Sequence, residues 1–349
     1  MNYFLTAFCI FLCRETATLN TEVLGDSKSD EIPLEAQMLT GEPLIRYLRE
    51  NQNLFEVEPA RHDYKLKLMD IGLMDKNRKP VVENDGPDDD IPESFDGRKV
   101  WSNCSSLSYI RDQSNCGSCW AVATASAISD RICILTKGAM QVTISATDIL
   151  SCCEFCGFGC RGGSTIEAWN YFTEEGVVSG GNYGTKGCCQ PYPLPPCGHH
   201  ENETFYYECN KEAATPECQK RCHPGYRKLY RMDKFYGKGA YELPNSEKAI
   251  QREIMKHGPV VGMFRVFRDF YNYKSGVYKH TAGSQEGEHA VKIIGWGKEG
   301  ETPYWLIANS WHHDWGENGF FKMLRGSNHC RIEELVVAGL VDNDVTRRL

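Results

Sequence analysis

Residues 113–121 read Gln-Ser-Asn-Cys-Gly-Ser-Cys-Trp-Ala and place Cys119 where a polar turn runs into an apolar segment. From Trp120 to Cys133 the chain is rich in Ala, Val, Ile and Ser and has no Gly or Pro, which predicts a buried helix beginning near Cys119. The N–H groups and dipole of a first helical turn lower the pKa of a thiol, and a neighbouring imidazolium lowers it further. The stretch predicts a reactive cysteine, with a structural cysteine in a disulfide-rich domain as the alternative.

The nonapeptide resembles the active-site signature of papain-type cysteine proteases. His289 and Asn309 follow in the order that this family uses, each in an apolar run that predicts a strand. The resemblance implies that His289 is the acid and base paired with Cys119. It implies that Asn309 orients the imidazole ring and that Trp311 shields this hydrogen bond from water. It also implies that the Gln113 amide points at the developing oxyanion.

The fold that this resemblance implies is the papain-like two-domain α+β fold. A mainly helical lobe is expected to carry Cys119, and a β-barrel-like lobe is expected to carry His289 and Asn309. The cleft between the lobes is the expected site. By the same resemblance, the residues expected to bind substrate along the cleft include Gly162, Gly163, Trp311, Ala290 and Leu335.

A long insertion indicates which branch of the family the chain resembles. Cys189 to Gly237 contains Pro-Pro-Cys-Gly-His-His and further cysteines, and this pattern is similar to the occluding loop of cathepsin B. The resemblance covers residues 91–340 and places the loop at about 193–218. It implies that His199 and His200 hold the free carboxylate of the substrate, which is the basis for removing dipeptides from the C-terminus.

Cysteine usage indicates an oxidising compartment. Of 17 cysteines in 349 residues, Cys9 and Cys13 precede a cysteine-free stretch and the rest begin at Cys104. A dense cluster from Cys152 to Cys160 allows either zinc ligation or disulfides, and a secretory route favours disulfides.

The resemblance to cathepsin B also implies a set of disulfides. It leaves Cys119 free as the nucleophile, and Cys188 and Cys330 are left over. N-glycosylation acceptors occur at Asn103 and Asn202. The implied pairs are Cys104 with Cys133, Cys116 with Cys160, Cys152 with Cys218, Cys153 with Cys156, Cys189 with Cys222, and Cys197 with Cys209.

The N-terminal end is predicted to be processed. Residues 3–13 are almost wholly apolar, which predicts a signal peptide over residues 1–17. Residues 18–90 are expected to be a propeptide, and residues 91–349 the mature protease domain. The propeptide ends in an acidic, turn-rich linker suited to proteolytic opening.

The expected propeptide is polar apart from one amphipathic helix. This helix is expected at about Glu42 to Leu54, with Leu44, Ile45, Leu48 and Leu54 on one face. Because these few apolar residues cannot form a core of their own, we expect the propeptide to lie along the cleft as a strip. An independent N-terminal module is the alternative.

Several residues depart from the cathepsin B pattern. Leu335 stands where a glutamate forms the floor of the S2 pocket, which predicts a preference for apolar P2 side chains over Arg, and Glu334 beside it is a possible substitute. Glu288 replaces a glycine before His289, where we expect an exposed carboxylate that raises the histidine pKa only slightly.

The same pattern has two ion pairs that hold the occluding loop. Asp112 and His199 are expected to preserve the first. Asp314 is retained for the second, but residues 201–208 contain no Arg or Lys to meet it. We therefore expect a looser loop, more endopeptidase activity than is typical, and a shift towards endopeptidase action as His199 loses its charge near neutral pH.

The sequence as a whole predicts a secreted or lysosomal cathepsin B-like cysteine protease made as a zymogen, with peptidyl-dipeptidase and endopeptidase activity and no cofactor or metal. Tyr304 to Glu317 is similar to a signature of blood-feeding worms, which favours haemoglobin as a substrate and a gut lumen as a location. Expected partners are protein and peptide substrates, its own propeptide and cystatin-type inhibitors. The net charge of −8 and the absence of basic clusters exclude nucleic acid, and we expect a monomer without membrane association. The alternatives are an inactive secreted homologue that binds ligands and a strict endopeptidase with a displaced loop.

Overall fold

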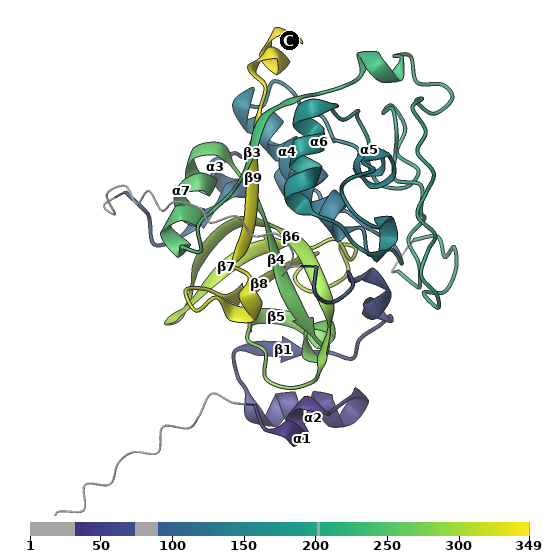
Figure 1. Cartoon of the computed structure of the whole chain (residues 1–349). Coiled ribbons are helices and arrows are strands. Elements are labelled where there is room, and N and C mark those ends of the chain that lie inside the picture. Colours follow the sequence, from purple (N-terminus) through teal and green to yellow (C-terminus); the bar gives the residue numbers. More distant parts are fainter. Residues whose placement is uncertain (1–31, 74–89, 201–202, 349) are drawn as a thin grey trace, which may run out of the picture. The chain divides into compact units, whose positions relative to one another are not determined.

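The computed structural model describes residues 32–73, 90–200 and 203–348 (Figure 1). The chain divides into two units, Met1–Ile32 and Pro33–Leu349, and the description below concerns the second. The predicted signal peptide, the acidic linker up to residue 89 and Asn202 lie outside the described residues. No helix of the described part is both long and apolar enough to cross a bilayer.

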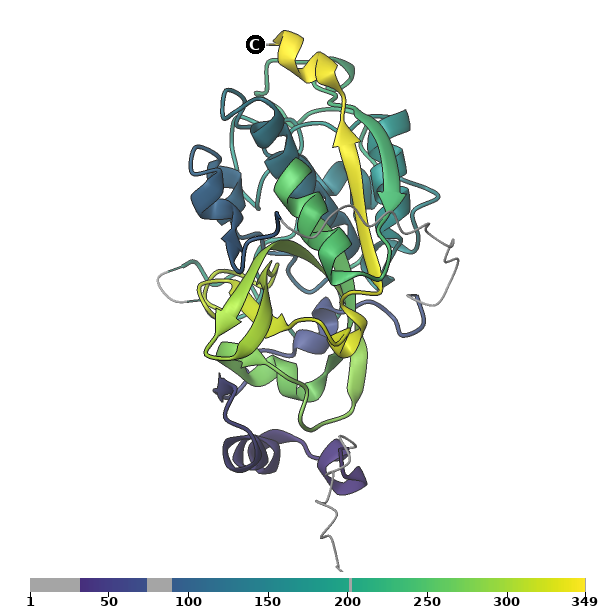
Figure 2. The ribbon, with the colours of Figure 1, turned by 90° about the vertical axis from the view of Figure 1, so that its left-hand side faces the viewer.

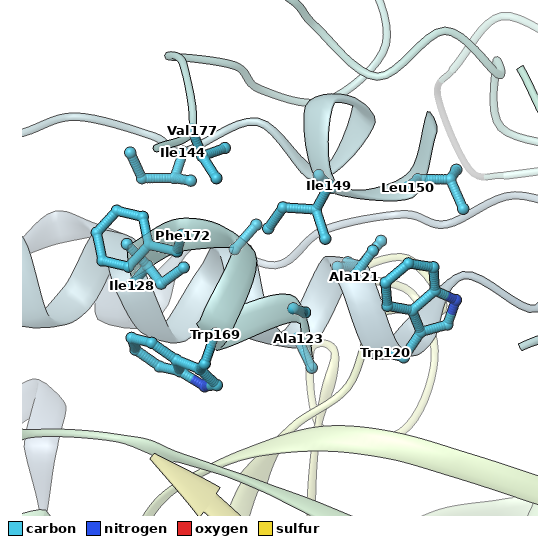
Figure 3. Packing of buried hydrophobic residues seen from close by; sticks show 14 of the residues in the cluster. Trp120, Ala121, Ala123, Ile128, Ile144, Ile149, Leu150, Trp169, Phe172 and Val177 are labelled. Carbon is cyan, nitrogen blue, oxygen red and sulfur yellow. The ribbon is translucent and has the colours of Figure 1, made fainter. Parts of the chain in front are cut away.

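One lobe is built around a long central helix. This helix, α4 (Cys119–Leu135), begins at the residue that the sequence indicates, and it is buried throughout its first four turns. Its side chains are small where neighbouring helices approach. The rings of Trp120, from α4, and of Trp169, from a neighbouring helix, fill the remaining space (Figure 3). The other helices of this lobe are α5 (Ala146–Cys152) and α6 (Thr165–Glu174), which are capped by serine hydroxyls that accept backbone N–H groups.

The second lobe is a strongly curved sheet. Its strands run in the order β1-β5-β8-β7-β6-β4-β9-β3, and β2 pairs with β6. The longest strand, β6, pairs antiparallel with both β4 and β7, and it lies centrally in the lobe (Figures 1 and 2). The strand bounds are β1 Phe55–Val57, β2 Phe95–Asp96, β3 Gly237–Glu242, β4 Val260–Phe267, β5 Tyr273–Tyr278, β6 Gln285–Glu299, β7 Thr302–Ala308, β8 Phe320–Leu324 and β9 Leu335–Val341.

The N-terminal segment (residues 33–73) packs on this sheet. It contains α1 (Leu34–Gln37), α2 (Gly41–Asn51), β1 and a short 3-10 helix at Tyr64–Lys67. Leu44, Ile45 and Leu48 of α2 are buried as predicted. The prediction that Leu54 shares their helical face is wrong, because the helix ends at Asn51 and the Gln52 side chain accepts the N–H of Leu54, which turns the chain into β1.

Two short helices complete the fold, α3 (Gly97–Val100) and α7 (Glu247–His257). Six disulfides join described residues, and they are the six pairs that the resemblance implies. All four cysteines of the Cys152–Cys160 cluster are in these bonds, so zinc ligation there is wrong. Cys119, Cys188 and Cys330 are free thiols.

The two lobes are joined where α4 packs along β6. Asp130 of α4 and Lys292 of β6 form a fully buried ion pair at 2.6 Å. The next residue, Arg131, donates to the carbonyls of Pro259 and Gly339, each at 2.8 Å. These bonds fix the helix against the sheet, because separating a buried charge from the groups that compensate it is costly.

We predict that Asp130→Ala destabilises the protein by about 3 to 5 kcal/mol, because it leaves the Lys292 ammonium buried without its counter-charge. Urea unfolding of the Cys119→Ser chain with disulfides intact measures the change. The Asp130→Ala, Lys292→Met double variant is the control and should recover part of the loss. A loss below about 1 kcal/mol in the single variant, the range of exposed pairs, would show that the pair does not hold the lobes together.

Candidate active site

The candidate nucleophile lies at the contact between the lobes. Cys119 is the first residue of α4, and Ala290 of β6 donates its backbone N–H to the Cys119 Sγ at 3.3 Å. Strand β6 therefore places His289, the residue before Ala290, near the thiol. The turn before Cys119 requires glycine, since a Cβ on Gly117 would collide with the carbonyls of Cys160 and Leu68.

The imidazole of His289 is oriented by a hydrogen bond to Asn309. Its Nε2 donates to Oδ1 of Asn309 at 2.7 Å, and the same oxygen accepts the N–H of Ser310 at 2.8 Å. The Trp311 ring lies 4.9 Å from the imidazole, centroid to centroid, and is buried. The other ring nitrogen, Nδ1, is buried without a hydrogen bond to any described residue.

The Gln113 amide is already occupied by a peptide carbonyl. Its Nε2 donates to the backbone oxygens of Lys67 and Cys116, each at 2.7 Å, while its Oε1 accepts the Ser310 hydroxyl at 2.6 Å. Lys67 belongs to the N-terminal segment. A carbonyl of that segment therefore takes the donor that was predicted to stabilise a substrate oxyanion.

The N-terminal segment crosses between the two lobes at this point. On the β side, Met69 and Glu288 exchange two backbone hydrogen bonds of 2.9 and 3.2 Å. On the helical side, Asp70 donates its N–H to the carbonyl of Arg161 at 3.2 Å, and the side chains of Met69 and Leu73 lie against Gly162. The segment thus covers the candidate substrate-binding glycine, as expected of a strip along the cleft.

This covering sets the charge state of the site. Burial raises the pKa of the Cys119 thiol to about 12, and burial lowers the pKa of His289 to about 4. The expectation of a lowered thiol pKa does not hold in this covered form, because desolvation outweighs the N–H groups that favour the thiolate. Both groups are neutral here between these two pKa values.

The candidate S2 region is apolar. Leu335 begins β9, pairs with Met263 of β4, and packs against the cluster that contains Met69 and Ala290. Glu334 does not enter this region, because Arg331 holds its carboxylate through bonds of 2.6 and 2.7 Å. Gly163, the second candidate glycine, lies against the Trp120 ring.

The expectation that Glu288 is exposed is wrong for this form. Its side chain is buried beneath the N-terminal segment, and its Oε1 accepts the N–H of Gly72 at 2.9 Å. Because the backbone of Glu288 also bonds Met69, this residue is a main anchor of the strip.

The two loop histidines lie in different environments. His199 is 75% exposed, stacks on Phe205 and lies 3.5 Å from Glu208. The His200 side chain is buried, and its Nδ1 bonds Oδ2 of Asp314 at 2.9 Å. The expected pairing of His199 with Asp112 is therefore wrong: His200 is the histidine that faces Asp112, at 4.0 Å, because the chain turns at Gly198 with φ +82° and directs the second ring inward.

Asp314 has partners that the sequence analysis missed. His312 donates from Nδ1 to its Oδ1 at 2.8 Å, and Arg61 of the N-terminal segment lies at 3.6 Å. Although burial opposes it, the bonds from His200 and His312 hold the pKa of Asp314 well below its usual range. The loop is thus held without a loop arginine, and the prediction of a looser loop is wrong.

Asp112 likewise receives a cation from outside the loop. Lys67 is fully buried and its Nζ lies 3.3 Å from Oδ1 of Asp112. Burial opposes ionisation of Asp112, but Lys67 and the N–H of Ser114 lower its pKa. The repeated His-His at 312–313, directly before Asp314, was the available signal for the missed histidine, whereas nothing in the local sequence pairs Lys67 or Arg61 with residues so far along the chain.

Comparisons with known proteins identify the family of the chain. Residues 91–340 match the family model described as papain family cysteine protease. The chain belongs to the papain family. It is 56% identical to cathepsin B-like cysteine proteinase 1 of Haemonchus contortus and 54% identical to that of Ostertagia ostertagi, with at least 98% of each chain covered. Among solved structures it resembles procathepsin B S9 of Trypanosoma congolense, with TM-score 0.73, 35% identity, and 87% of this chain and 98% of that chain covered.

These similarities make the chain a cathepsin B-like cysteine peptidase with a papain-like fold. Its described form has the fold of a zymogen, and an N-terminal propeptide region is implied by the similarity to a procathepsin. The relatives extend over the whole chain, so the N-terminal segment is part of the resemblance rather than an independent module.

We predict that acid weakens the hold of the N-terminal segment partly through His289. In the closed protease this ring takes up a proton only below about pH 4, whereas an exposed imidazole does so near 6.5. Since the opened form binds the proton more tightly, lowering the pH from 6.5 to 4 favours opening, and above 6.5 the effect vanishes. Lys67, which also disfavours the imidazolium, leaves with the segment.

Hydrogen exchange of the Met69 amide measures this opening. Cys119→Ser and the Cys119→Ser, His289→Gln double variant are compared at the same pH, so that intrinsic exchange rates cancel. The single variant should lose more protection between pH 6.5 and 4 than the double variant. Identical losses would remove His289 from the opening equilibrium.

Proposed function

We propose that the chain is the zymogen of a secreted peptidase that uses a Cys119–His289 thiolate–imidazolium pair. The observation that carries the proposal is the Lys67 carbonyl held by the Gln113 amide, because the donor of an oxyanion hole already holds a peptide carbonyl there. Removing the N-terminal segment rehydrates the thiol and the imidazole, which allows the proton to pass from Sγ to His289.

The reaction then proceeds by acyl transfer. Cys119 Sγ bonds to the scissile carbonyl carbon, and the oxyanion takes the Gln113 amide that Lys67 has vacated. The C–N bond breaks as His289 gives its proton to the leaving amine, and water, deprotonated by His289, releases the acyl group. Asn309 keeps the ring in place and Trp311 shields that bond, for which the 2.7 Å distance and the burial of both groups are the support.

We further propose peptidyl-dipeptidase activity alongside endopeptidase activity. His199 supplies an exposed imidazole for a substrate carboxylate, and His200, whose ring is bonded to Asp314, ties the loop that carries both histidines to the protein. This tie favours exopeptidase action over the strict endopeptidase alternative. The inactive homologue is disfavoured because Cys119, His289 and Asn309 are all present at one site.

The setting of this activity follows from the sequence arguments. We propose cleavage of a signal peptide over residues 1–17 and of a propeptide over 18–90, passage through the secretory pathway, and action in a lysosome or an extracellular space such as a gut lumen. Protein substrates such as haemoglobin, cystatin-type inhibitors, a monomeric state and glycosylation at Asn103, which is exposed, and Asn202 belong to the same proposal.

We predict that a long peptide with a free C-terminus is shortened two residues at a time by the activated enzyme. Its C-terminally amidated twin should be cut mainly at internal bonds. The His199→Ala, His200→Ala variant should lose at least tenfold in kcat/KM on the free acid and little on the amide, since a charge-assisted hydrogen bond contributes about 1.5 to 3 kcal/mol. Mass spectrometry of timed digests distinguishes the ladders.

Cys119→Ser is the control for the same digests and should abolish both patterns. Internal cuts on both peptides, abolished by Cys119→Ser, would leave the cysteine peptidase standing and disprove the dipeptidase proposal. Equal processing of acid and amide would have the same meaning.

We predict that P2 Phe is strongly preferred over P2 Arg. Leu335 offers no counter-charge, and Glu334 is already paired with Arg331. Leu335→Glu should raise kcat/KM for P2 Arg at least tenfold relative to P2 Phe, and Leu335→Gln, of the same shape without the charge, is the matched control. Equal kcat/KM for the two substrates in the unaltered enzyme would disprove the assignment.

A further inference from the structure

Three donor side chains converge beside the loop. Asp112, His200 and His312 come from segments far apart in the sequence, yet each offers one ligand atom and these atoms all lie within 4.8 Å of one another. The two imidazoles are 3.8 Å apart, centroid to centroid. None of the proposed catalytic steps uses His312.

Asp314 orients both imidazoles in the same way. Its Oδ2 is 2.9 Å from Nδ1 of His200, and its Oδ1 is 2.8 Å from Nδ1 of His312. A carboxylate on one ring nitrogen fixes the ring and makes the other nitrogen a better metal ligand, an arrangement that recurs behind metal-bound histidines. Each Nε2 is therefore the nitrogen presented for binding.

Asp112 supplies the observation that points to a ligand. Its Oδ2 is buried and has no hydrogen bond to any described residue, although its Oδ1 is bonded to Ser114 and Lys67. A buried carboxylate oxygen that makes no hydrogen bond is costly. A cavity of about 230 Å³ lined in part by Asp112, His312 and Glu203 provides an entry path and room for water.

We propose that Asp112, His200 and His312 bind one divalent transition-metal ion of the zinc type, with water from the cavity as the fourth ligand. Two imidazoles and a carboxylate match zinc rather than calcium or magnesium, which prefer all-oxygen sites. Tetrahedral zinc holds such ligands about 3.4 Å apart, so the site closes slightly on binding.

The metal replaces existing contacts and joins separate segments. In the structure described, Nε2 of His200 is 3.1 Å from the Cys197 carbonyl and Nε2 of His312 is 3.1 Å from Glu203. Binding releases any protons on these nitrogens and exchanges those contacts for metal bonds. The ion therefore ties the loop residue His200 to the body of the protein.

The test uses the full-length Cys119→Ser chain, so that the candidate nucleophile cannot itself bind zinc when the N-terminal segment opens. After removal of metal with a chelator, calorimetric titration with zinc chloride should give one site. His312→Asn should weaken it at least tenfold, and hydrogen exchange of residues 203–209 should slow with zinc only in the parent. Asparagine suits this position because residue 312 has φ +78°, where Asn is among the best tolerated side chains.

His313→Asn is the matched control, since this neighbouring histidine is exposed and should leave zinc binding unchanged. An equal loss in His313→Asn would move the ion to an outer set of Glu203, His312 and His313 and overturn the proposal. Absence of stoichiometric binding, or unchanged affinity in a His312→Asn chain whose circular dichroism matches the parent, would overturn it as well.

Discussion

The packing of α4 against β6 is the constraint on which the site depends. The thiol and the imidazole come from different lobes, so neither lobe alone can build the reactive pair. Asp130 and Lys292 hold the helix to the strand in the protein interior, and eleven residues nearer the N-terminus of α4 the Ala290 N–H reaches Cys119. Because the ion pair fixes the helix on the strand, it also fixes the relative positions of Cys119 and His289 in the cleft.

The N-terminal segment binds where these two lobes meet. It bonds to both lobes through its backbone and brings two cations, Lys67 and Arg61, to the carboxylates of Asp112 and Asp314. Buried carboxylates need such compensation, and here part of it comes from a segment that is expected to be removed. Because His200 and His312 also bond Asp314, that carboxylate keeps two partners after activation.

Much of the fold and of the candidate site was predictable from local sequence. The helix at Cys119, the strand of His289 and the cysteine pairing follow from specific motifs and from the resemblance that they support. The errors lie where distant segments meet. Whether His199 or His200 turns inward depends on the backbone at Gly198, and the partners of Asp314 depend on tertiary packing. The thiol pKa lies above the predicted range because burial under the N-terminal segment outweighs the N–H groups of the helix N-terminus.

The Lys67 carbonyl on the Gln113 amide shows that the donor is assembled before any substrate arrives. Activation then requires little rearrangement of the cleft. It depends chiefly on the concentration of the N-terminal segment near the cleft. While it is tethered, a short segment acts at an effective concentration in about the millimolar range. After the linker is cut, only the bulk concentration of the segment counts. In a dilute fluid the cleaved segment would stay dissociated and the enzyme would stay active. In a confined compartment the cleaved segment would rebind and inhibit the enzyme.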